Sequence, residues 1–350
     1  MPRARSKLLL GVDIHDAAVH ACRVRATDMG PEILDAWTEE ISEGGGHFSD
    51  RAAEALRRIV RKNRLNGEKA CVTVPDSQAI YANVILPSNS RAELQGMVEL
   101  YVEQQALFPA NGAVAGFTVL HAVEPAGSRV GIASANRLQV QERMDIARAA
   151  GLTPSIAVTG GLAAARYFAH YIRNDHRPAI VLYGESGAVC IYVISAAGLL
   201  MAHTVSLDDG AAPSPDAVIR GIRLAAENAP GDAPGRIIMC GDARGIPHPS
   251  VLELELGLPV SVSVGDEYTP SGLLDTLRAA GAALEMDPSQ NSGANLAPRR
   301  ERREARGPVR ARVVWAALIV FAILIAAAAG YAASVSRARA GQLRAVQKRL

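Results

Sequence analysis

Aromatic side chains and cysteines are scarce in this chain of 350 residues. Phe, Trp and Tyr together make up 4% of it, and they do not alternate with the basic residues. Base stacking needs aromatic rings beside Lys and Arg, so this composition argues against nucleic acid as a partner. The four cysteines form no CxxC pair. We therefore expect four small, buried thiols in a reducing compartment, without a zinc site or a disulfide framework.

Patterns of catalytic or metal-binding residues are also missing. The eight histidines are scattered, and no HExxH segment occurs. No Ser-His-Asp or Cys-His arrangement can be argued from spacing, so we expect no metal and no catalytic residues. The N-terminus lacks a secretory signal, because Asp13 interrupts its short apolar run too early. The first part of the chain is therefore expected in the cytoplasm.

Charge of either sign is absent from Val313 to Ser334. A helix needs about 20 residues to cross the hydrocarbon core of a bilayer, which is about 30 Å thick. Trp315 and Tyr331 lie near the two ends, as aromatic residues do at membrane interfaces. Residues 313–334 are therefore predicted to form a single transmembrane helix.

The net charge of +2 hides a local surplus of arginine ahead of this segment. Fewer basic residues follow the segment than precede it, which predicts that the preceding side faces the cytoplasm and anionic headgroups. We expect a bacterial inner-membrane protein with one span and a cytoplasmic N-terminal domain. The membrane-flanking arginines are Arg299, Arg300, Arg302, Arg303, Arg306, Arg310 and Arg312.

Residues 335–350 carry apolar side chains at helical spacing, at Leu343, Val346 and Leu350. This pattern predicts the start of a periplasmic amphipathic helix, through which copies of the chain would self-associate as a coiled coil.

Residues 1–286 repeat one plan twice. In each half, three strand-like runs are followed by a helix-like run and another strand, and an extra block at about residues 70–150 interrupts the first half. This order predicts an α/β fold with helices on the faces of a sheet. Within the block, Ser90 followed by Glu93 is a capping-box pattern and predicts a helix over residues 90–106. Residues 287–312 read as a linker.

The duplicated plan resembles the actin-like ATPase superfamily and, more narrowly, the PilM family of type IV pilus assembly. GVDIHDAAVHACRV is similar to the family's first phosphate-loop hairpin, and VTVPDSQAIYANVILP to its inserted subdomain. ARAAGLTPSIAVTGG resembles the return to the main lobe, and RIIMCGDA the strand before the adenosine turn. The resemblance implies a duplicated actin-like fold with an inserted subdomain, followed by the span.

The resemblance also implies a Mg·ATP site, and three loops depart from the pattern. His15 stands where a glycine should let the backbone approach phosphate, the second loop lacks its aspartate, and Gly241-Asp242 replaces Gly-Gly. We expect no enzyme activity and no cofactor, with weak binding of ATP and Mg²⁺ as the alternative. The residues implied for nucleotide binding are Asp13, Gly184, Gly187 and Gly241.

ANLAPRRERRE, ahead of the span, is similar to the N-terminus of PilN, whose Asn-Leu-x-Pro peptide docks into a groove of PilM. Asn295, Leu296 and Pro298 match, and Ala297 stands where Leu is usual. The chain thus resembles a PilM–PilN fusion, and the implied function is a membrane-anchored scaffold of the pilus inner-membrane platform. Its peptide would dock in cis or on a neighbouring copy.

Three alternatives stay open. The L-protein of type II secretion has a related layout, with an actin-like domain ahead of a single span, so the partners would be platform proteins of either system. An ATP-binding switch or a sugar-kinase-like enzyme of the same superfamily would need a competent phosphate site. An FtsA-like anchor would carry an amphipathic C-terminal helix, which the uncharged segment disfavours.

Overall fold

The computed structural model describes residues 8–27, 30–105, 112–185, 187–206, 213–242, 245–262, 274–287 and 293–298. The predicted span, the membrane-flanking arginines and residues 335–350 lie outside the described residues. Within these ranges, none of the helices has the length and apolar character needed to cross a bilayer. Met1–Pro298 forms one compact unit. It extends beyond residue 286, the expected end of the body, because residues 293–298 pack against it.

The first half of this unit is built on a five-stranded sheet with the order β3-β2-β1-β4-β8. The first three strands run antiparallel to their neighbours, and β4 and β8 run parallel to β1. β1 is apolar except for Asp13, because both faces of its sheet are covered. The elements are β1 (Leu8–Ile14), β2 (Ala18–Thr27), β3 (Gly30–Glu40), α1 (Phe48–Lys62), β4 (Lys69–Val74), α3 (Arg137–Ala149) and β8 (Thr153–Thr159).

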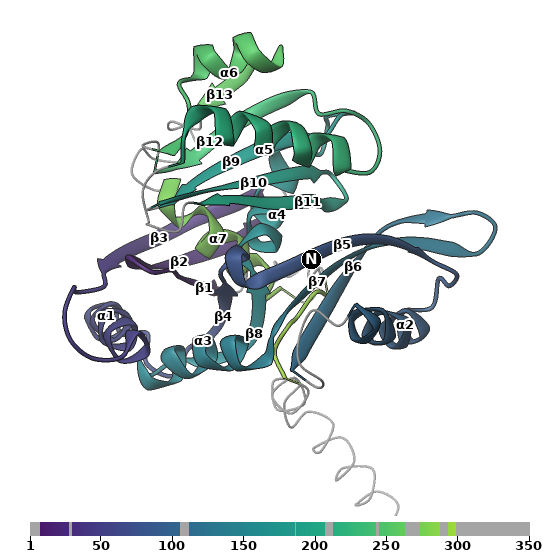
Figure 1. The fold of residues 1–350 in the computed structure, drawn as a ribbon. Coiled ribbons are helices and arrows are strands. Elements are labelled where there is room, and N and C mark those ends of the chain that lie inside the picture. Colours follow the sequence, from purple (N-terminus) through teal and green to yellow (C-terminus); the bar gives the residue numbers. More distant parts are fainter. Residues whose placement is uncertain are drawn as a thin grey trace, which may run out of the picture. The chain divides into compact units, whose positions relative to one another are not determined.

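The second half repeats this topology, with the strand order β11-β10-β9-β12-β13. α5 packs on the outer side of its sheet (Figure 1). The elements are β9 (Ala179–Glu185), β10 (Ala188–Ser195), β11 (Gly198–Ser206), α5 (Pro215–Asn228), β12 (Arg236–Gly241), α6 (Pro249–Leu256) and β13 (Val260–Val262). The duplicated plan predicted from the sequence is confirmed, including the order of three strands, one helix and one strand.

The inserted subdomain is a three-stranded antiparallel sheet, β5-β7-β6, with α2 against it (Figure 1). It is smaller than the predicted block of residues 70–150, because β4 and α3 belong to the first half. Its elements are β5 (Ala79–Leu86), α2 (Arg91–Gln104), β6 (Ala113–Val123) and β7 (Gly127–Asn136), and the short η1 (Asp76–Gln78) connects β4 of the first half to β5.

The predicted capping box of α2 is absent. Ser90 is the N-cap residue, but its side chain makes no capping bond. The Ser88 hydroxyl instead bonds the Glu93 carboxylate at 2.5 Å, and Ser88 Oγ accepts from the Ser90 amide at 2.9 Å. The helix was predicted correctly, but the serine that pairs with Glu93 lies two residues earlier.

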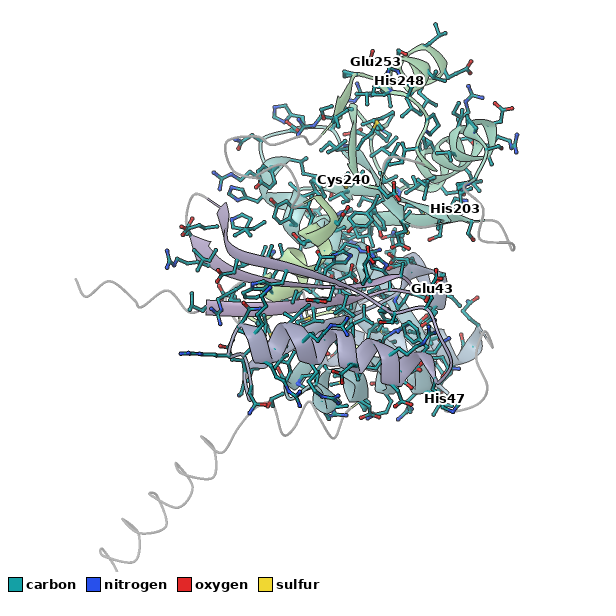
Figure 2. All side chains as sticks on the ribbon, turned by 90° about the vertical axis from the view of Figure 1, so that its left-hand side faces the viewer. Glu43, His47, His203, Cys240, His248 and Glu253 are labelled. Atoms are coloured by element: carbon teal, nitrogen blue, oxygen red, sulfur yellow. The ribbon has the colours of Figure 1, made fainter. Side chains whose placement is uncertain are left out.

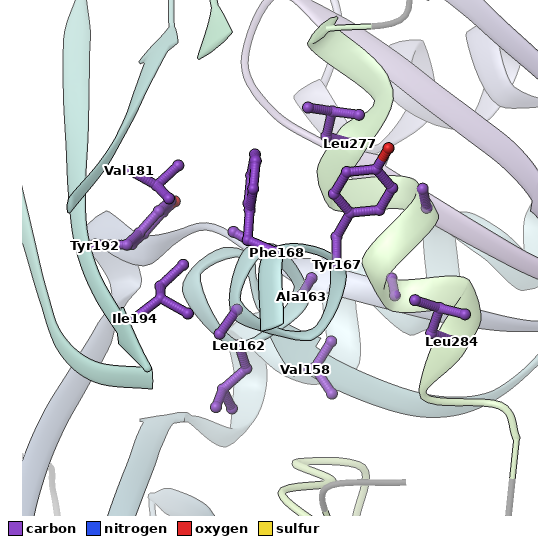
Figure 3. Close-up of a cluster of buried hydrophobic side chains, with 14 of the residues drawn as sticks. Val158, Leu162, Ala163, Tyr167, Phe168, Val181, Tyr192, Ile194, Leu277 and Leu284 are labelled. Carbon is purple, nitrogen blue, oxygen red and sulfur yellow. The ribbon is translucent and has the colours of Figure 1, made fainter. Parts of the chain in front are cut away.

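Two helices join the halves. α4 (Gly160–Tyr171) and α7 (Leu277–Leu284), which follows the short η3 (Leu274–Thr276), lie side by side between the two sheets. Their apolar side chains pack against those of both sheets in one core (Figure 3). A side chain at Gly281 would overlap the carbonyl of Ala163, so the two helices can approach this closely only through glycine.

Candidate functional site

A cleft of about 1320 Å³ opens where the two halves face each other. The β1–β2 turn, β3 and the loop ahead of α1 line one side, and the ends of β9 and β12 line the other. Figure 2 shows His47 at the N-terminal end of α1, and Glu43, in the loop between β3 and α1, belongs to this wall. This is where the sequence resemblance places a nucleotide, since Gly184 and Gly241 lie in it.

The cleft is rich in carboxylates. Its cations are Arg51 and Arg58, and Arg58 is already paired with Glu39 at 3.1 Å. A polyphosphate entering the cleft would meet repulsion from the remaining acidic groups, which is strong in a partly desolvated site. The acidic residues are Asp16, Glu39, Glu40, Glu43, Glu185, Asp242 and Asp275.

Arg278 of α7 lies under the floor of the cleft, 1% exposed. Its Nε and Nη2 atoms each lie 2.9 Å from Asp13 Oδ2. Nη1 bonds the Glu185 carboxylate and lies 3.8 Å from Asp76 Oδ2. The guanidinium also lies 4.3 Å from the centre of the Tyr183 ring. One buried cation thus contacts three carboxylates and an aromatic face.

These contacts determine the ionisation of Asp13 and Arg278. Burial alone would raise the pKa of Asp13, but the charge of Arg278, with smaller effects of His15, His20 and a hydrogen bond from Thr73, lowers it to about 2. Burial would lower the pKa of Arg278, yet Asp13 and Glu185 raise it well above its ordinary value. Asp13 and Arg278 are therefore both ionised at neutral pH.

Asp76 joins three parts of the molecule. Its carboxylate accepts from the Tyr81 hydroxyl of the inserted sheet, from the Tyr192 hydroxyl of β10 at 2.6 Å, and from the Gly161 amide of α4 at 2.8 Å. Burial raises the pKa of Asp76, against the charge of Arg278 and these hydrogen bonds. Asp76 therefore connects the first half to the second half and to the insertion.

The residues present do not fit the Mg·ATP that the actin-like fold implies. A magnesium ion would need Asp13 oxygens to hold its water shell, but Thr73 donates to Oδ1 and Arg278 to Oδ2. Tyr183, which stands where the second loop begins, is buried, and its hydroxyl donates to the Asp275 carbonyl at 2.6 Å. The charge of the site and the engaged oxygens of Asp13 do not suit a metal-bound triphosphate.

Backbone packing and conformation explain why glycine occupies the three positions that the resemblance assigns to nucleotide binding. Gly184 and Gly241 are paired on parallel strands, and a side chain on Gly184 would overlap the Asp242 carbonyl. A side chain on Gly241 would overlap the carbonyl of Gly184. Gly187 turns the β9–β10 hairpin with a φ of +77°, a conformation that favours glycine. Their role in nucleotide binding stays a prediction.

The Asn-Leu-x-Pro segment lies on the free edge of β8. The Leu296 amide donates to the Ala157 carbonyl at 2.7 Å, and the Asn295 side chain accepts from the Ala157 amide at 3.1 Å. Asn295 Oδ1 also accepts from the Ala297 amide at 2.8 Å, which holds the segment in a turn. The matched residues Asn295 and Leu296 therefore act together, and Pro298 follows as the last described residue.

Leu296 lies beside the edge of β8 and is 0% exposed. It belongs to the same buried cluster as Val114 of β6, Ala135 of β7 and Val140 of α3. The segment passes so close to β6 that a Cβ atom at Gly116 would lie 2.5 Å from the Ala294 carbonyl carbon. Glycine at position 116 thus leaves room for the backbone of the segment.

The burial of the cysteines agrees with the sequence analysis. All four are free and buried, and Cys240 lies inside the second half (Figure 2). Burial raises the pKa of each thiol above its ordinary value, so none is a reactive thiolate. In the parts of the chain that the structure describes, no group of three or more His, Cys, Asp or Glu side chains is arranged to hold a metal.

Sequence reasoning missed Arg278, Asp76 and Tyr192. Their partners are distant in sequence, with 265 positions between Arg278 and Asp13. One signal was available: Arg278 is the one charged residue of the apolar helix LRAAGAAL. A cation on a helix that must be buried requires an anionic partner.

The comparisons with known proteins agree with this geometry. The model of the type IV pilus assembly protein PilM matches residues 11–193, which is more than half of the chain. A chain of the PilM–PilN type IV pilus biogenesis complex superposes with a TM-score of 0.66 at 16% identity, covering 82% of this chain and 100% of that chain. At this identity the likeness shows the fold alone. No curated protein matches the chain.

Two further solved structures are less similar. One is the cytoplasmic domain of EpsL, an inner-membrane component of the type II secretion system of Vibrio cholerae, with a TM-score of 0.46, 14% identity, and 79% and 94% of the two chains covered. The other is a Bacteroides thetaiotaomicron protein with an actin-like ATPase fold, with a TM-score of 0.47, 9% identity, and 79% and 96% covered. The duplicated sheets and the match over residues 11–193 together lead to one conclusion. This chain has the actin-like fold and belongs to the PilM family of type IV pilus assembly proteins.

Proposed function

We propose that this chain is a non-catalytic, membrane-anchored scaffold of the type IV pilus inner-membrane platform, in which a PilM-like body is fused to a PilN-like peptide and span. The observation that carries the proposal is the docking of Ala294–Ala297 on β8, with Leu296 fully buried. The chain would link cytoplasmic components to periplasmic ones by contact instead of by turnover.

The docked segment uses a common mode of peptide recognition. Backbone hydrogen bonds to a free strand edge supply affinity, and one apolar side chain in a pocket supplies specificity. Here the edge is β8 and the anchor is Leu296. Because the segment belongs to the same chain, its effective concentration is high and the groove stays filled in cis. A structurally similar chain belongs to a PilM–PilN type IV pilus biogenesis complex, which supports this assignment.

The membrane anchor is proposed from the sequence. Residues 313–334 carry no charge, and arginines precede them. A span at this place would hold the docked segment, and the body with it, at the cytoplasmic face of the inner membrane. The type II secretion platform is the alternative setting, since its L-protein has the same layout. Platform partners that co-purify with the full chain would distinguish the two systems.

Peptide docking is tested by Leu296→Asp in the full-length chain. Burial of a leucine contributes about 1.5–3 kcal/mol, so losing it should increase the undocked population at least about tenfold. Elastase, which cuts after alanine, should then cleave around residues 290–300 about tenfold faster, with the sites identified by mass spectrometry. Leu254→Asp is the matched control, because Leu254 is 84% exposed on α6 and should leave the cleavage rate unchanged.

Anchoring is tested separately by fractionating cells that express the full chain. The chain should stay in the membrane pellet after washing with high salt or alkaline carbonate and enter solution only with detergent. Recovery of dispersed, intact chain from the aqueous fraction without detergent would contradict the anchor, whereas unchanged elastase cleavage in Leu296→Asp would contradict the docking.

A further inference from the structure

Buried carboxylates from both halves converge on one point of the cleft floor. Asp13 lies on β1 and Asp76 follows β4, so both belong to the first half, whereas Glu185 ends β9 in the second half. All three contact the guanidinium of Arg278. Oxygen atoms from several carboxylates are the ligands that hard divalent cations prefer. In this protein the cation that meets the three carboxylates is the side chain of Arg278, around which they are spaced.

We propose that Arg278 is a built-in substitute for the metal ion of this cleft, which closes the site to Mg·nucleotide and ties the two halves of the body together permanently. The inference rests on the proposed non-catalytic function and gives it a physical cause. In a nucleotide switch the cation arrives and leaves with its ligand. Arg278 is covalently part of α7, so it stays in place.

The geometry of the guanidinium suits this role. Its planar fork presents five N–H groups, and here separate edges face separate carboxylates. Nε and Nη2 meet Asp13 at 2.9 Å, and Nη1 faces Glu185 and Asp76. A lysine ammonium would keep the charge but lose the fork. One Arg278 side chain thus contacts all three carboxylates, a task that in its absence would fall to a metal ion.

Two tyrosines of the second half, Tyr183 and Tyr192, add contacts to Arg278 and to its carboxylate partner Asp76. Tyr183 of β9 lies against the face of Arg278, and its hydroxyl reaches the Asp275 carbonyl of η3. Tyr192 of β10 donates to Asp76 at 2.6 Å. Each of these contacts crosses from one half to the other or to the helix between them. Opening the cleft would break all of them together, so the body is held in one arrangement.

The test uses Mn²⁺ as the probe, because the electron paramagnetic resonance signal of free Mn²⁺ falls when the ion is bound. The full-length chain in detergent is titrated as wild type, Arg278→Ala, Arg278→Lys, and Arg278→Ala combined with Asp13→Asn. Circular dichroism follows folding of each sample with and without Mn²⁺. Arg278→Lys is the matched control that keeps a cation in the site.

We expect wild type and Arg278→Lys to bind no Mn²⁺ at this site, and Arg278→Ala to bind one equivalent that excess Mg²⁺ displaces. Adding Asp13→Asn should weaken that binding at least about tenfold. If Arg278→Ala does not fold alone, Mn²⁺ should restore its folding. Stoichiometric Mn²⁺ uptake by wild type overturns the inference, and so does an Arg278→Ala chain that neither binds Mn²⁺ nor folds with it. Neither result bears on peptide docking or anchoring, so the proposed scaffold can fail or survive independently.

Discussion

His20 illustrates how single side chains set the charge of the cleft. Its Nδ1 lies 2.8 Å from the Thr38 hydroxyl, and its Nε2 lies 2.7 Å from Nε2 of His15. Burial, with the nearby charge of His15, lowers the pKa of His20 to about 4, and Asp13 opposes the change. Burial also lowers the pKa of His15. Both rings are therefore neutral at pH 7 and offer no positive charge to a phosphate.

This depressed pKa predicts a pH dependence of stability. The pKa of His20 is about 4 in the folded chain and 6.5 unfolded, so its contribution is fully present above about pH 6.5 and is lost as the pH falls toward 4. Between pH 7 and pH 5 the loss is about 2 kcal/mol. His20→Gln should flatten this decline, as measured by thermal unfolding of the full chain at both pH values. Equal slopes for wild type and variant would show that His20 does not carry the effect.

Single residues also show best what could not be predicted from the sequence. Asp13 was identified through the resemblance to the family's first phosphate loop, but its partner Arg278 lies on the last helix of the body. Pairing between residues so far apart follows from tertiary packing, which hydrophobic periodicity does not encode. Leu296 was found through a peptide motif, and its burial against β8 became visible only when the groove was assembled.

At the scale of elements, the strand edge of β8 is the most informative surface. Edge strands expose unpaired backbone groups and are usually protected. Here the chain's own segment covers Ala157, and Gly116 on the neighbouring β6 leaves room for it. The fold of the first half therefore includes a site that a later part of the same chain completes.

Gly116→Ala tests this close approach. Because its methyl group would overlap the Ala294 backbone, the variant should loosen the segment and speed elastase cleavage around residues 290–300 several-fold. Gly96→Ala is the matched control: Gly96 lies in α2 with nothing within 4 Å of an added methyl group. It should leave cleavage unchanged and stabilise the helix by about 0.5–1 kcal/mol. Equal cleavage of both variants would argue against a tight fit at Gly116.

Most elements were predictable because their apolar residues follow a strand or helix period. The duplicated strands and helices are confirmed, and so is the helix after Ser90. The sequence could not place β4, because its pairing with β1 and β8 decides to which sheet it belongs. The cap of α2 was wrong because Ser88 competes for Glu93.

At the scale of the whole molecule, the PilM-family body has two sheets joined through α4, α7 and the Arg278 contacts. A relative that works as a nucleotide switch would need this junction to open. The carboxylate-rich cleft and the internal cation argue that it stays closed. The proposed fusion would then transmit force or position from a fixed body to the membrane.

Addition of Mg·ATP to the full-length chain should therefore leave its melting temperature unchanged. A ligand at a hundred times its Kd would stabilise the folded state by about 2.7 kcal/mol, which differential scanning fluorimetry detects easily. Phosphate release measured on the same sample should equal the background without protein. A reproducible rise in Tm with Mg·ATP, or turnover abolished by Asp13→Asn, would favour the nucleotide-switch alternative.

The central claim is that the peptide-binding site at the edge of β8 is filled by residues 293–298 of the same chain. The most direct measurement is a fluorescence-anisotropy titration of the full-length chain into a labelled peptide, GANLAPRR, which copies residues 293–300. We predict no binding to wild type, whose groove is filled, and saturable binding to the Leu296→Asp chain, whose groove is vacated. A peptide with aspartate in place of its leucine should bind neither protein. Equal binding of GANLAPRR to both proteins, or to neither, would contradict the account.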